Sequence, residues 1–78
     1  MRYFFHVREG ESYLLDDEGL ELADVASALA AATAGARSII AAEAVQGNLP
    51  LRAIIEVDDE KGKRVFDLPF RETIRVDG

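Results

Sequence analysis

The stretch VASALAAATAGARSIIAAEAV, residues 25–45, decides the fold of this chain. Ten of these residues are alanine, which has the highest intrinsic propensity for the α-helix. Asp24 is the expected N-cap, because its carboxylate can accept hydrogen bonds from the free amides of the first turn. Gly47, followed by Pro50, marks the expected end of the helix. The sequence therefore predicts one long helix over residues 25–45.

Before this helix the sequence predicts a β-hairpin. Residues 2–8 are rich in aromatic and β-branched side chains, which alternate between the two faces of a strand. Gly10 can adopt the positive φ that a tight turn requires, and residues 12–15 return as a short second strand. Residues 16–19 then form a polar loop.

After the helix the sequence predicts a second hairpin. Residues 51–57 form a strand of alternating character, residues 58–62 a polar turn, and residues 63–68 the return strand. Pro69 cannot donate to a sheet ladder, so residues 70–76 fit a short edge strand, a turn or both. The predicted order is β-β-α-β-β, which is typical of an α+β fold with a small antiparallel sheet and one long helix packed on one face.

The composition predicts a single domain over residues 1–78. Hydrophobic residues make up 49% of the chain and charged residues 31%, which is a foldable mixture. The net charge of −6 argues against nucleic acid and anionic membrane surfaces as partners, because both are bound largely through basic residues. There is no cysteine, and no stretch is expected to act as a secretory signal or to approach the length of a transmembrane helix. We therefore expect a cytoplasmic protein without membrane contact.

No set of residues predicts catalysis, a cofactor or a metal site. His6 is the single histidine and lies in the middle of a strand, where a structural or surface role is the simplest interpretation. The acidic clusters at 16–18 and 58–60 lack the spacing of a calcium loop, so they are interpreted as solvated turns. The glycines form no phosphate-binding loop, and there is no cysteine nucleophile. The protein is therefore expected not to be an enzyme.

The helix has two predicted faces. Apolar residues at helical spacing form the expected core face: Val25, Leu29, Ala32, Ala36, Ile39 and Ile40. The opposite face, called the back face below, has small or apolar side chains and no charge: Ser27, Ala30, Ala34, Ser38, Ala41 and Val45. A solvated helix usually carries more charges, so the back face is a candidate interface with a second helix or a partner chain. The alternative is an ordinary alanine surface exposed to water.

The sheet offers a second candidate interface. A single helix covers one face of the sheet, and the other face should then be polar. Phe4, Ile54 and Phe66 are candidates for one apolar set on that open face, although Phe66 also fits the core.

Two N-terminal motifs are distinctive: RYFFHVR at residues 2–8 and DEGLEL at residues 17–22. Together with the alanine-rich helix and with IEV at 55–57 running into DEKG at 59–62, they resemble a family of short bacterial proteins catalogued only as a domain of unknown function. The resemblance covers nearly the whole chain and implies the same element order. Family members often have aspartate at the position of His6, and their helix carries more arginine and glutamate. The resemblance implies no activity, cofactor or catalytic residue.

These observations favour a small non-enzymatic protein-interaction module that self-associates, with a homodimer as the expected state. An antitoxin-like or regulatory partner of another protein is the alternative, by analogy of fold alone. A third hypothesis, an enzyme or metal protein, requires His6 to lie within a few ångströms of Asp16 or Asp58.

Overall fold

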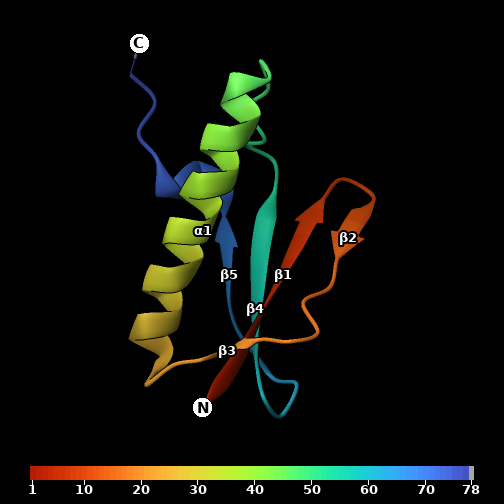
Figure 1. Ribbon diagram of the computed structural model, residues 1–78, viewed down its shortest axis with the longest axis vertical. Helices are drawn as coiled ribbons and strands as arrows, with labels where there is room; N and C mark the ends of the chain where they lie inside the picture. The colour runs from red at the N-terminus through yellow and green to blue at the C-terminus, as the bar shows by residue number, and fades with distance from the viewer. Residues whose placement is uncertain (78) are drawn as a thin grey trace.

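A computed structural model describes residues 1–77 as an α+β fold (Figure 1). Its elements are β1 (Arg2–Glu9), β2 (Ser12–Leu14), β3 (Leu20–Glu21), α1 (Val25–Val45), β4 (Ile54–Asp59), β5 (Arg64–Pro69) and the 3₁₀ helix η1 (Phe70–Thr73). The predicted fold class is confirmed: a small antiparallel sheet carries one long helix on one face. The two-residue strand β3 is an addition to the predicted order.

The sheet is built around β1. Its strands follow the order β2-β1-β4-β5, every pair is antiparallel, and β3 pairs with the start of β1. Both β2 and β3 use the same edge of β1, at opposite ends: Val7 to Glu9 pair with β2, and Arg2 and Tyr3 pair with β3. A gap therefore remains between them on this edge, where residues 15–19 leave the sheet.

The helix has the predicted bounds because both of its ends are capped. The Asp24 carboxylate accepts a hydrogen bond from the Ser27 amide at 2.8 Å, as expected of an N-cap. At the other end, the Asn48 amide donates to the Glu43 carbonyl at 2.9 Å and the Gly47 amide to the Ala44 carbonyl at 3.0 Å. This pair of bonds is a Schellman motif, and the φ of 89° at Gly47 is the left-handed conformation that it requires.

The prediction of which residues form the core face of α1 was partly wrong. The buried helix residues form a single row at intervals of four: Ala28, Ala32, Ala36 and Ile40. The predicted members Val25, Leu29 and Ile39 are exposed instead. Packing along an i, i+4 row follows from the angle at which the helix crosses the strands, and the small alanines let the helix backbone approach the sheet. The rotation of the helix is thus set by its packing partner.

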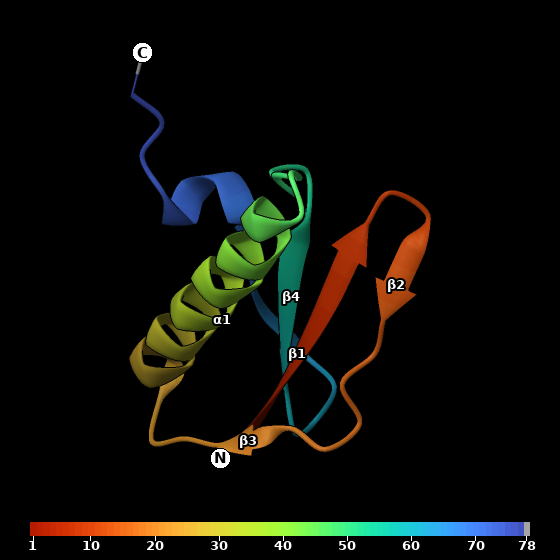
Figure 2. The same ribbon diagram turned by 45° about the horizontal axis from the view of Figure 1, so that its top comes forward.

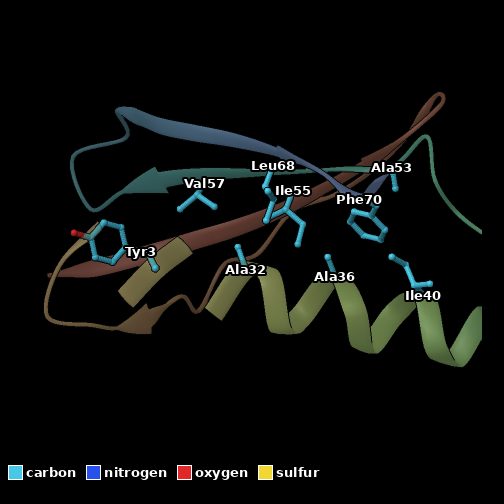
Figure 3. Close-up of a cluster of buried hydrophobic side chains, with 10 residues drawn as sticks. Tyr3, Ala32, Ala36, Ile40, Ala53, Ile55, Val57, Leu68 and Phe70 are labelled. Carbon is cyan, nitrogen blue, oxygen red and sulfur yellow. The ribbon is translucent and has the colours of Figure 1, made fainter. Parts of the chain in front are cut away.

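The core lies between α1 and the inner face of β4 and β5 (Figure 3). Val57 and Phe70 are its largest completely buried side chains. Phe70 begins η1, and its amide donates to the Ala53 carbonyl at 2.9 Å. The Arg37 guanidinium donates to the Thr73 carbonyl at 2.7 Å and thereby ties α1 to η1. The ambiguous segment 70–76 therefore begins as a 3₁₀ helix that closes one end of the core.

The single helix covers only part of the sheet. In both views α1 lies on the side of β4, β5 and η1, while β2 and the adjoining part of β1 extend beyond it (Figures 1 and 2). Neighbouring strands are about 4.8 Å apart and a helix with its side chains is about 10 Å wide, so one helix covers about two strands. The inner face is thus only partly covered on the β1–β2 side, where Phe5 and Val7 are half-buried and Leu14 of β2 is 69% exposed.

Candidate functional site

A groove lies between α1 and the uncovered part of the sheet. It has a volume of about 230 Å³ and is lined mainly by apolar side chains, among them Phe5, Val7, Leu20, Ala31, Gly35 and Ile39. Pockets for small molecules usually measure about 300–1,000 Å³, so this groove is small for a cofactor. Its size and apolar lining suit side chains from another protein surface.

The apolar surface continues beyond the groove onto β2. Leu14 pairs with Val7 across the β1–β2 ladder, so the two side chains lie on the same face of the sheet. Leu14 is 69% exposed, Leu20 48% and Ile39 37%. Single exposed leucines are ordinary, but several around one apolar groove are typical of an interaction site.

The back face of α1 is solvent-exposed and uncharged, as the sequence predicted. Ala30, Ala34, Ser38 and Ala41 are exposed, Ser27 is half-buried and Val45 is 84% exposed. Ala31 and Gly35, which line the groove, directly follow Ala30 and Ala34 in the helix, so the groove and the back face adjoin. The sequence found this surface but missed the groove, because the groove depends on where α1 lies on the sheet.

The structure separates the three residues predicted for the other sheet face. Phe4 and Ile54 do lie on the outer face, since they pair with Asp58 and Arg8 in the β1–β4 ladder. Phe66 lies opposite Val57 and packs against the core on the inner face. Phe66 points inward because the register from Ile54↔Pro69 to Val57↔Phe66 is regular, which puts it on the same side as Leu68.

The outer face carries a charged network around Glu56. Its carboxylate accepts from Arg8 at 2.9 Å and from Arg64 at 3.2 Å, and Arg64 also donates to Asp58 and Asp67. The hydrogen bond from Arg8 holds the pKa of the Glu56 carboxyl below its usual range, although burial opposes this. Each of these three carboxylates accepts from a guanidinium, so the network is a structural polar surface of the kind expected on the uncovered face.

His6 lies on the same outer face and meets the geometric requirement of the third hypothesis. Its Nδ1 accepts from the Asp16 amide at 3.1 Å, and its Nε2 lies 3.3 Å from Asp58 Oδ2. The ring is only 8% exposed, and both nitrogens have partners within the fold. A general base needs a nitrogen that a substrate can reach, so this arrangement favours a structural role for His6.

Asp16 holds the loop of residues 15–19 against the gap in the edge of β1. Its carboxylate accepts from the amides of Phe5 at 3.0 Å, Gly19 at 3.1 Å and Glu18 at 3.2 Å. Burial alone would raise the pKa of the Asp16 carboxyl, but these three bonds outweigh it and lower the pKa. The interpretation of residues 16–18 as a solvated turn was therefore wrong for Asp16. The signal that could have found it is the Asp-x-x-Gly spacing of Asp16 and Gly19, typical of an aspartate that bonds its own loop.

Two further properties bear on possible ligands. Among residues 1–77, no group of three or more histidine, aspartate or glutamate side chains is placed to hold a metal ion.

By length and composition α1 is long and apolar enough to cross a membrane, so the expectation that no stretch approaches that length was wrong. This signal is weak, because the core helix of a small protein passes the same criterion.

These features define a small α+β protein whose antiparallel sheet is half covered by its single long helix, with an apolar groove beside that helix. The chain belongs to the family described as Domain of unknown function (DUF6894), which it matches over residues 2–71. The resemblance to a domain of unknown function is thereby confirmed. No curated protein and no solved structure matches the chain.

Proposed function

We propose that this protein is a small non-enzymatic interaction module that self-associates through the groove and the back face of α1. The observation that supports the proposal is the partly covered apolar surface of the inner sheet face on the β1–β2 side, where Leu14 and Leu20 are exposed. A sheet buries its apolar face against another layer, and this chain supplies only half of that layer.

The energetic case rests on the exposed side chains around the groove. Full burial of a leucine or isoleucine contributes about 1.5–3 kcal/mol, so the exposed parts of Leu14, Leu20 and Ile39 contribute about 1 kcal/mol each. In a two-fold dimer every contact occurs twice. A chain of 78 residues buries only roughly 60% of its unfolded surface, so association also adds to a thin margin of stability.

The test is the solution mass by light scattering over a concentration series. We expect a mass of twice the 8.6 kDa chain at high concentration and a return to 8.6 kDa on dilution. Leu14→Glu and Ile39→Glu should each shift the equilibrium to monomer. Leu49→Glu is the matched control, because Leu49 is similarly exposed and follows the helix outside the groove.

A wild-type protein that remains monomeric at every concentration would refute self-association. That result would favour the alternative, a regulatory partner of another protein that occupies the same groove. A dimer that Ala34→Glu leaves intact would exclude the back face from the contact.

The proposal also takes the protein to be cytoplasmic and without membrane contact. The absence of cysteine fits a reducing compartment. Arg37 and Glu43 oppose insertion of α1 into a bilayer, because charged side chains are costly there. Recovery of the protein in the membrane fraction after alkaline extraction would contradict this part of the proposal.

A further inference from the structure

We infer that the groove is filled by α1 of a second copy, so that the two α1 helices form one shared layer between two sheets. This inference rests on the self-association proposed above and specifies its geometry.

The uncovered part of the sheet has the width of one helix. Four strands lie side by side in the order β2-β1-β4-β5, and α1 packs on β4 and β5. A second helix is needed over β1 and β2 to complete the layer. Within residues 1–77, α1 is the only helix longer than the four residues of η1. A second copy of the chain therefore supplies the missing helix.

The back face of α1 provides the complementary surface. A two-fold axis parallel to α1, on the groove side of the helix, places the partner's α1 over β1 and β2. The same rotation places the partner's β1 and β2 against the back face of the first α1. One symmetry operation thus covers both apolar surfaces that the single chain exposes, the groove and the back face. Neither the groove lining nor the back face carries a charged side chain.

Gly35 lies where the two helices meet. It is the central residue of α1, and its groove side has open space, because a Cβ built there meets no atom within 4 Å. No contact among residues 1–77 requires glycine at this position, although glycine disfavours a helix relative to alanine. Around the proposed axis Gly35 faces its own counterpart, where the missing side chain allows the helices to approach closely.

Disulfide cross-linking tests this geometry directly, because the chain has no cysteine of its own. Gly35→Cys is oxidised at a concentration where light scattering shows the dimer, and the product is resolved on a non-reducing gel. We expect most of the protein to form a covalent dimer, since a disulfide requires Cα atoms within about 7 Å. Ala26→Cys is the matched control, because this exposed helix residue points away from the groove and should stay monomeric on the gel.

A second variant is needed in case the thiol at position 35 itself prevents the two helices from approaching. Ala31→Cys lies one turn earlier on the groove side, where a Cβ is already present. If both variants remain dimeric by mass but neither cross-links, the shared helix layer is refuted and self-association stands. If the wild-type chain never dimerises, self-association itself is refuted, and the geometry with it.

Discussion

Replacement of Asp16 by alanine should destabilise the protein markedly, whereas replacement of its neighbour Asp17 should not. The Asp16 carboxylate accepts hydrogen bonds from three amides, and the Asp16 amide donates to His6 Nδ1. The Asp16 side chain fills the gap that β2 and β3 leave on the edge of β1. Asp17→Ala is the matched control, because Asp17 is the exposed neighbouring residue in the same loop.

The magnitude follows from which amides lose their acceptor. The bond to the Phe5 amide is partly buried, and an amide left without a partner there costs about 1–3 kcal/mol. The Glu18 and Gly19 amides can form hydrogen bonds with water instead. Their two lost bonds together therefore add about 1 kcal/mol to the loss in the free energy of unfolding. The expected loss is about 2–4 kcal/mol, out of a total of about 4–12 kcal/mol for a domain of this size. Asp17→Ala should change the free energy of unfolding by less than about 0.5 kcal/mol.

The effect should also depend on pH in a defined direction. The pKa of the Asp16 carboxyl is lower in the folded protein than its ordinary value. Its contribution to stability is therefore present above about pH 4 and is lost as the pH falls through the folded-state pKa. The difference between wild type and Asp16→Ala should be full at pH 7 and should shrink towards pH 3.

Urea denaturation at both pH values measures the free energies, and the ¹⁵N signals of the single histidine report on the loop. In the wild type these signals should show a proton on Nε2, because Nδ1 accepts from the Asp16 amide. An Asp16→Ala variant as stable as Asp17→Ala at pH 7 would show that the carboxylate does not support the edge of β1.

Four other substitutions test the local geometry by urea or thermal denaturation. Gly35→Ala should stabilise the monomer, measured at low concentration, by about 1 kcal/mol, and a loss of stability would show that the space beside Gly35 is not open. Gly19→Ala should destabilise by more than about 1 kcal/mol, because Gly19 has a φ of 71° and its Cβ would meet the Tyr3 carbonyl at 2.8 Å; an unchanged melting temperature would contradict this. Phe70→Ala should lower the free energy of unfolding by about 3–5 kcal/mol, and a loss below about 1 kcal/mol would show that Phe70 is not packed in the core. Asp24→Ala should cost about 1 kcal/mol, and no change would mean that the N-cap is not formed.

Local signals allowed much of this fold to be predicted from the sequence. The bounds of α1 follow from alanine content, the Asp24 cap and Gly47, all within a few residues of the helix ends. The predicted alternation of residues 2–8 between two faces is confirmed, with Tyr3 on the inner face and His6 on the outer face. Such features depend on neighbours in the chain, which a sequence displays directly.

The errors concern long-range packing. Val25 and Leu29 were assigned to the core because helical periodicity gives a stripe but not the angle at which α1 crosses the strands. The orientation of Phe66 depends on the pairing of β5 with β4, where Phe66 lies opposite Val57, and no local pattern shows this pairing. The groove joins segments that lie apart in the sequence, so it was not predicted, and the His6–Asp16 contact entered only as a requirement of the third hypothesis.

The edges of this sheet also determine how the protein behaves when it is concentrated. β2 has three residues, and β5 contains a bulge and ends at Pro69, which has no amide to donate. In the gap between β2 and β3, the Asp16 carboxylate occupies the Phe5 amide. A foreign strand thus finds few free amides in a row on either side. The molecule can expose apolar side chains on its faces while its rims resist the strand addition that leads to fibrils.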